Sequence, residues 1–360
     1  MSSFSVKDYS WEYKSCFPYG STETSHITSH MKITPVADIP ERPVPIFDNT
    51  NQPGRNMALE RMLEQSALFQ EQTTFWRRPL ELWFSPCSQP WKPGICVNDE
   101  SHTVLDISAV SPWKNNIGLL VGRTRVQVLE HVVGLLAGLG IDADIILRSS
   151  VFPFRSVSLP TKIDCVQQYA DVLMQPSQTS VVGKRKTFTV AEPTRIEFEN
   201  KRWSYAILLP DEGWNELIVD VMVSYPGAIG TQRARVKIND EVIQRYIAGA
   251  RTPSYGFRRK LMRILDTLPV FQRIVNIDSS RTVSIGKKGI ENPRSEYDFR
   301  GINIELLMHE VLDKLGAYGI PLQGGARFVG TVMVFAAGHG HDLSVMRAMQ
   351  NGGIQIAHSS

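Results

Sequence analysis

The sequence predicts an α+β fold, with helices packed on sheets that are mainly antiparallel. Short segments with strand-like alternation occur in both halves of the chain, amphipathic helical segments separate them, and regular strand–helix–strand alternation is rare. The halves also resemble each other weakly. A helical segment carrying His131-x-Val133 ends at Gly140, and one carrying His309-x-Val311 is followed by Gly319. We therefore expect a duplicated unit with a pair of helices on each sheet.

Residues 1–56 are expected to form an N-terminal extension. The segment is rich in Ser, Thr and Pro and shows no sustained period. It is also more aromatic than a disordered tail usually is, with Tyr9, Trp11, Tyr13, Phe17 and Tyr19. We expect irregular structure that docks on the body of the protein or on a partner.

Residues 57–182 are predicted to form a first α+β domain. Residues 57–69 fit either a short helix or an extended lead-in, and strands are expected to follow. Helices are predicted over 125–139 and 161–174, and Gly138 and Gly140 close the first of them. The polar residues 175–184 predict a linker between domains.

Residues 183–360 are predicted to form a second α+β domain. Its strands are expected at 186–190, 194–198, 204–209 and 217–225, and a helix over 303–315 follows. A strand over 328–335 then leads into a glycine-rich turn that carries His339 and His341, before a last helix that begins near Leu343.

Composition excludes several classes of protein. The 360 residues are 42% hydrophobic and 21% charged, as in ordinary soluble proteins, and the net charge of +3 argues against a dedicated nucleic-acid binder. The basic run at Arg258–Lys260 is explained more simply as a solvated face. Neither a membrane span nor a signal peptide is evident. The four cysteines lack metal-type spacing, so we expect a reducing, cytoplasmic environment.

The helix predicted over 303–315 carries a first candidate site. His309 and Asp313 are four residues apart, so on a helix they share one face and can reach one divalent cation. Such a pair is common by chance, and a solvated polar stripe is the more frequent explanation for it. A third ligand from elsewhere in the chain is needed to decide between the two.

Glu130 and His131 form a second candidate site, because both interrupt an otherwise apolar helix. A salt-bridged carboxylate and a hydrogen-bonded core imidazole remain the simple alternative. Together, however, His131, His309 and Asp313 make the two-His, one-carboxylate set of catalytic zinc sites. Zn²⁺ would activate a water and polarise a carbonyl, and Glu130 would take the water's proton. His339 or His341 would protonate a leaving amine, so these residues suffice for amide hydrolysis.

Several motifs resemble those of the UDP-3-O-acyl-N-acetylglucosamine deacetylases, which act in lipid A and lipopolysaccharide biosynthesis. The similar stretches are LEHVVGLLAGLGID, YPGAIGTQR, ARTPSYGF, MHEVLDKLG and GHDL, in the family's order over residues 76–350. The resemblance implies two similar domains with helix layers packed between their sheets. It also implies Zn²⁺ bound by His131, His309 and Asp313, with Glu130 as general base, His341 as general acid and Thr252 as a polarising group for the substrate carbonyl.

The implied activity is hydrolysis of an N-acyl group from an acylated amino sugar, and a lipid-like substrate would place the protein near a membrane surface. Three positions depart from the family pattern: Ser156 replaces an acid, Glu310 a lysine and Ala317 an aspartate. Two hypotheses therefore stand. The chain is a zinc-dependent deacetylase, or it is a catalytically weak paralogue that binds or regulates, with residues 1–56 docking a partner.

Overall fold

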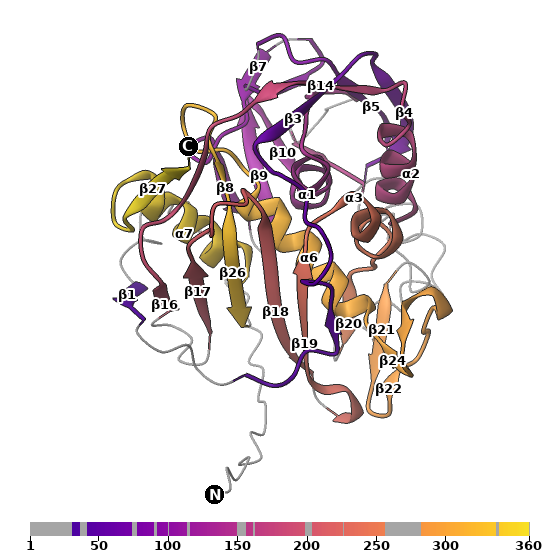
Figure 1. The fold of residues 1–360 in the computed structure, drawn as a ribbon. Helices are drawn as coiled ribbons and strands as arrows, with labels where there is room; N and C mark the ends of the chain where they lie inside the picture. The colour runs from indigo at the N-terminus through magenta and orange to yellow at the C-terminus, as the bar shows by residue number, and fades with distance from the viewer. Residues whose placement is uncertain are drawn as a thin grey trace, which may run out of the picture.

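The computed structural model describes residues 31–36, 42–73, 78–89, 92–99, 101–113, 116–149, 156–160, 163–198, 204–225, 227–255, 282–335 and 338–359. Over these residues the protein is a mixed α+β structure, as predicted (Figure 1). The aromatic residues of the first thirty positions and the basic run at Arg258–Lys260 lie outside the described residues.

The largest sheet has seven strands and draws mainly on the second half of the chain. Most neighbours are antiparallel, whereas β18 pairs in parallel with β26, and β19 with β2. In spatial order the strands are β1 (Met31–Pro35), β16 (Thr194–Phe198), β17 (Tyr205–Leu209), β26 (Gly330–Phe335), β18 (Leu217–Tyr225), β19 (Gly230–Lys237) and β2 (Phe47–Asp48).

Three smaller sheets are built mainly from the first half. The five-stranded sheet contains β4 (Ala67–Gln72), β5 (Pro79–Ser85), β12 (Asp144–Ser149), β6 (Gly94–Val97) and β7 (Ser101–Val104). The four-stranded sheet contains β13 (Ser156–Ser158), β10 (Thr124–Gln127), β9 (Asn116–Val121) and β8 (Val110–Trp113). The third contains β11 (Ile141–Asp142), β3 (Leu59–Leu63) and β14 (Thr179–Lys184).

The remaining strands form short sheets. One contains β25 (Arg327–Phe328), β15 (Thr187–Val190) and β27 (Ile356–Ser359). A second contains β20 (Pro253–Tyr255), β21 (Val283–Gly286) and β22 (Gly289–Ile290). The third pairs β23 (Asp298–Phe299) with β24 (Ile302–Asn303). Short 3₁₀ turns occur at η2 (Gly227–Ile229) and η5 (Ser295–Tyr297).

The helices are α1 (Glu130–Leu139), α2 (Ile163–Leu173), α3 (Asp240–Val242) with the π-turn η3 (Ile243–Ile247), α6 (Glu305–Tyr318) and α7 (His339–Gln350). Every residue of α1 is buried, which fits its almost wholly apolar sequence. Helix α6 packs against β18 and β19 on one side and against α1 and α7 on others. Among the described residues, no helix is long and apolar enough to cross a membrane.

Several local predictions need correction. The helix predicted over 125–139 begins only at Glu130, because residues 124–127 form β10 and Val128 adopts a left-handed conformation (φ 63°) between the two elements. Residues 59–63 and 67–72 are strands, so the extended alternative for this stretch is correct. The predicted linker is wrong in its second half, where β14 pairs with β3.

The predicted N-terminal extension joins the seven-stranded sheet at both edges. Strand β1 pairs with β16 at one edge, and β2 pairs with β19 at the other. Between them, the buried Arg42 guanidinium lies 3.1 Å from the carboxylate of Asp220 on β18. This part of the extension is therefore integrated into the fold. The division into domains over 57–182 and 183–360 stays a prediction, and its boundary falls inside β14.

Candidate metal centre

Two glycines allow α1 and α6 to approach closely enough to share one site. A Cβ atom on Gly316 would lie 2.3 Å from the carbonyl oxygen of Glu130, and one on Gly134 would lie 2.6 Å from that of Leu312. Both obstacles are backbone atoms, which cannot rotate away. The absence of a side chain at these positions therefore lets the first half of α1 lie against the second half of α6.

At this crossing, three predicted ligands converge. The Nε2 atom of His131 lies 3.4 Å from Asp313 Oδ1, and that of His309 lies 3.5 Å from Asp313 Oδ2. One potential ligand atom from each residue lies within 4.8 Å of the other two. We call these residues, His131, His309 and Asp313, the cage. The two histidines are buried and the aspartate nearly so.

The chemistry of the cage fits a zinc ion. Tetrahedral Zn²⁺ holds nitrogen and oxygen ligands at about 2.0–2.2 Å, so its ligand atoms lie roughly 3.3–3.6 Å apart. The two imidazole–carboxylate separations, one to each oxygen of Asp313, are of that order. Asp313 Oδ1 is buried, yet accepts no hydrogen bond from the described residues. A buried carboxylate oxygen in that state is readily explained as a ligand atom.

The electrostatics of the cage follow from burial and from its one carboxylate. Burial lowers the pKa of His309 to about 4, which keeps its imidazole neutral as metal binding requires. Burial also tends to lower the pKa of His131, but the neighbouring Asp313 carboxylate outweighs this and raises it. Burial disfavours the charged form of Asp313, yet the imidazoles of His309 and His339 hold its pKa well below the usual range.

Glu130 begins α1 and lies directly before a cage residue. Its side chain is buried, and Oε2 accepts a hydrogen bond of 2.9 Å from the Ile117 amide on β9. Burial raises the pKa of this carboxyl group. A carboxylate that is fixed through one oxygen and has a raised pKa is suited to accept a proton near neutral pH.

The two histidines predicted beyond β26 occupy different environments. Both belong to the first turn of α7 rather than to a strand-end loop. His339 Nε2 lies 3.6 Å from Asp313 Oδ2, at the rim of the cage. The ring of His341 stacks on Phe198 of β16, with centroids 4.1 Å apart. Of the two, His339 is therefore the imidazole that the structure brings to the cage.

Thr252 lies on the segment that passes His309. The carbonyl of Ala250 lies 3.3 Å from His309 Nδ1, and the Thr252 carbonyl accepts a hydrogen bond from the Val283 amide. Between them, the Arg251 guanidinium binds both carboxylate oxygens of Glu305 at 2.7 and 2.9 Å. This buried ion pair fixes the segment across the start of α6, so it also orients the His309 ring.

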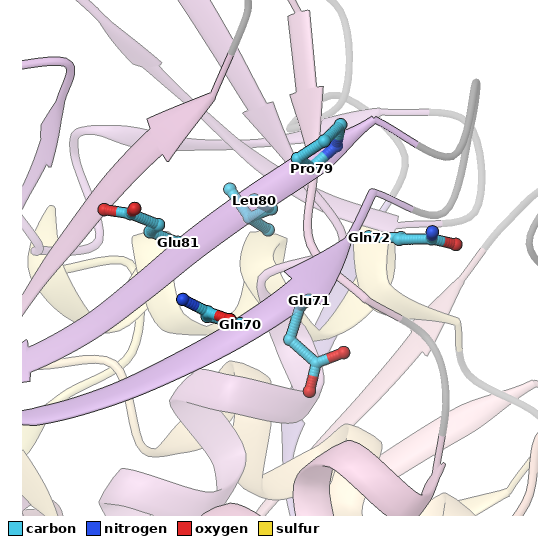
Figure 2. A pocket seen from close by; sticks show the side chains of 6 residues that line it. All are labelled: Gln70, Glu71, Gln72, Pro79, Leu80 and Glu81. Carbon is cyan, nitrogen blue, oxygen red and sulfur yellow. The ribbon is translucent and has the colours of Figure 1, made fainter.

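A separate pocket lies on the β4–β5 hairpin and contains none of the predicted site residues. Its volume is about 450 Å³, and it is lined by Gln70, Glu71, Gln72, Pro79, Leu80 and Glu81 (Figure 2). In Figure 2 the side chains of Glu71 and Glu81 point away from each other on their two strands. They therefore do not form a paired-carboxylate site.

Sequence reasoning missed the residues that support the cage. By residue type alone, the glycines at the helix crossing did not differ from other glycines. The Arg251–Glu305 pair joins residues 54 positions apart, so no local pattern indicates it. One signal was available: Gly134 and Gly316 each follow a histidine of the cage within two turns of helix, as expected where two helices cross beside a shared ligand.

Comparison with known proteins identifies the family. The family model of the UDP-3-O-acyl N-acetylglycosamine deacetylases matches residues 78–351. The chain is 22% identical over 246 residues to the UDP-3-O-acyl-N-acetylglucosamine deacetylase of Syntrophotalea carbinolica, covering 68% of this chain and 72% of the relative. The enzyme of the same name from Psychrobacter cryohalolentis is 24% identical over 256 residues (69% and 73%), and that of Acinetobacter baumannii 25% over 235 residues (65% and 70%). The chain belongs to the UDP-3-O-acyl N-acetylglycosamine deacetylase family.

Proposed function

We propose that this protein is a zinc-dependent deacetylase that removes an N-acyl group from a nucleotide-linked, acylated amino sugar of the lipid A pathway type. The supporting observation is the convergence of His339 and the cage, with Glu130 directly before a cage residue, in a member of this family. The proposed substrate class comes from the names of the relatives, and the proposed metal comes from the two imidazoles and one carboxylate of the cage.

His131, His309 and Asp313 would hold the metal, which when bound would lower the pKa of a water and polarise the amide carbonyl. Glu130 accepts the proton of the attacking water, because its carboxylate is buried beside the cage and anchored by the Ile117 amide. The Arg251–Glu305 pair keeps the Ala250 carbonyl against His309 and so orients that ligand.

We assign the general-acid role to His339 rather than to His341. His339 contacts the cage carboxylate, whereas His341 stacks on an aromatic ring of the seven-stranded sheet. From this position, His339 can donate a proton to the leaving amine. Thr252 is proposed to contribute to binding of the substrate carbonyl, because its segment runs beside His309.

The test combines metal analysis with a deacetylation assay on UDP-3-O-acyl-N-acetylglucosamine and related N-acyl amino sugars. We expect about one zinc per chain. Glu130→Gln should retain that metal and lower kcat by about 10²–10⁴-fold, the usual contribution of a general base. His339→Ala should lower kcat within the same range, and His341→Ala should lower it far less. A purified protein without stoichiometric metal contradicts the proposal.

A second candidate function is motivated by Glu310 and Ala317, which depart from the family pattern next to the cage. On that hypothesis the protein binds metal and ligand without turnover. Stoichiometric zinc with no deacetylation of any substrate in the panel would favour it over the hydrolase. Part of the N-terminal segment already pairs with this chain's own sheet, so those residues are less accessible for docking a partner.

A further inference from the structure

A buried ion pair connects α6 to α7 next to the proposed site. Lys314 Nζ lies 2.7 Å from Asp342 Oδ2, and the two side chains are 2% and 0% exposed. Lys314 directly follows Asp313 of the cage in the chain. Asp342 lies three residues after His339, so these two share one face of α7. Each partner of the pair is therefore adjacent to a residue of the site.

The location of this pair calls for an explanation, because burying two charges is costly unless they meet in good geometry. Apolar side chains at both positions would pack the two helices together without that cost. A charged pair, in contrast, favours the one relative position of α6 and α7 in which the two charges meet. Glu310 Oε2 lies 3.9 Å from the same ammonium group and adds a second, weaker contact on α6.

His339 itself has little else to hold its ring in place. Its Nδ1 atom is buried and has no hydrogen-bond partner among the described residues. Gly338, directly before it, caps α7 without a side-chain hydrogen bond. The direction of the imidazole therefore depends on where the first turn of α7 is fixed, and Asp342 is the buried charged residue of that turn.

We propose that Lys314 and Asp342 are positioning residues that fix the first turn of α7 and thereby hold His339 against the cage. The 3.6 Å separation of His339 Nε2 from Asp313 Oδ2 is then a consequence of the ion pair one turn away. This inference rests on the proposed role of His339 as the proton donor. It adds a pair of residues that act through that histidine and touch neither metal nor substrate.

The central variant is Lys314→Met, which keeps much of the buried stem and removes the charge. Amide hydrogen exchange of the full-length zinc-loaded protein should become about tenfold faster or more in residues 339–345, while α1 changes little. The kcat should fall by about 10²-fold with KM nearly unchanged, because a displacement of about 1 Å has that effect on a proton donor. Zinc content should not change.

Two controls separate positioning from general destabilisation. Arg327→Met removes a cation from another buried pair, in which Arg327 Nη2 lies 3.0 Å from Asp142 Oδ1. It should lower stability without selective exchange in α7 and without the loss of kcat. Combining Lys314→Met with His339→Ala should give no further loss beyond His339→Ala alone, since Lys314 acts only through that ring.

Should Lys314→Met fail to fold, Asp342→Asn must give the same exchange pattern. Unchanged exchange at the start of α7 in the folded variants overturns the proposal, and so does a loss of kcat that adds to that of His339→Ala. If wild-type protein binds zinc but deacetylates no substrate, the proposed function fails. The exchange measurement then still decides whether the ion pair fixes α7.

Discussion

The cage and a second buried cluster place ionisable side chains at similar depth but balance their charges differently. The second cluster, which we call the arginine cluster, contains Arg185 and Arg327 with Glu60 and Asp142, all nearly inaccessible to solvent. Arg185 contacts both carboxylates, and so does Arg327. Two cations face two anions, so the arginine cluster needs no ligand to be neutral.

The cage instead presents two imidazoles and one carboxylate with their ligand atoms facing one another. A neutral imidazole has one acceptor and one donor nitrogen, and a carboxylate has only acceptors, so a cation would suit the acceptor atoms that meet here. The difference separates two uses of buried charge. The arginine cluster joins β3 and β11 to β25, whereas the cage has the donor set of a cation site.

The largest effect on stability is expected in the arginine cluster. Arg185→Met leaves two buried carboxylates with one fewer guanidinium, which should cost about 3–5 kcal/mol in the free energy of unfolding. Urea denaturation followed by circular dichroism measures this. Zinc content of the folded fraction should stay the same. Loss of metal in this variant would mean that the two clusters are not independent.

Metal binding should produce the next largest effect. Zinc at a hundredfold excess over its Kd should raise the free energy of unfolding by about 2.7 kcal/mol, since it binds only the folded cage. Differential scanning calorimetry of metal-free protein, with and without zinc, tests this. His131→Ala should lose the stabilisation and, with the metal, the deacetylation activity. Equal stabilisation of that variant would place the metal elsewhere.

The helix crossing should be sensitive to a single methyl group. Gly316→Ala forces a Cβ atom against the Glu130 carbonyl, and such overpacking costs about 1–3 kcal/mol. It should also weaken zinc binding, because α1 and α6 must move apart. Gly353→Ala is the matched control, since its new Cβ would lie 3.5 Å from the nearest atom. Zinc titrations of both variants compare them, and equal affinities would contradict the glycine argument.

The smallest effect provides a calibration. Arg148 and Asp99 form an ion pair of 3.1 Å whose side chains are 49% and 61% exposed. Asp99→Asn should change the free energy of unfolding by less than about 1 kcal/mol, because water screens exposed pairs. Thermal unfolding at low and high salt measures it. An effect as large as that of Arg185→Met would contradict the expectation that a buried ion pair contributes more to stability than an exposed one.

Much of the fold was predictable because its signals are local. Alternation in β16 and β18 and the helical period in α6 depend on neighbours within a few residues. The start of α1 was mispredicted because Val126 of β10, Val128 and Leu129 also fit the apolar pattern of the helix that follows. Only the left-handed conformation at Val128 separates strand from helix there.

The sequence by itself determined that His309 and Asp313 share a helix face, since helical spacing fixes this, and the order of motifs indicated the family. Only the tertiary structure decided that His131 meets them, because two glycines set how closely α1 and α6 cross. It also places His339, rather than His341, beside the cage. Side chains two positions apart on a helix point about 200° away from each other. The rotation of α7 about its own axis, which its packing sets, therefore determines which imidazole faces the cage.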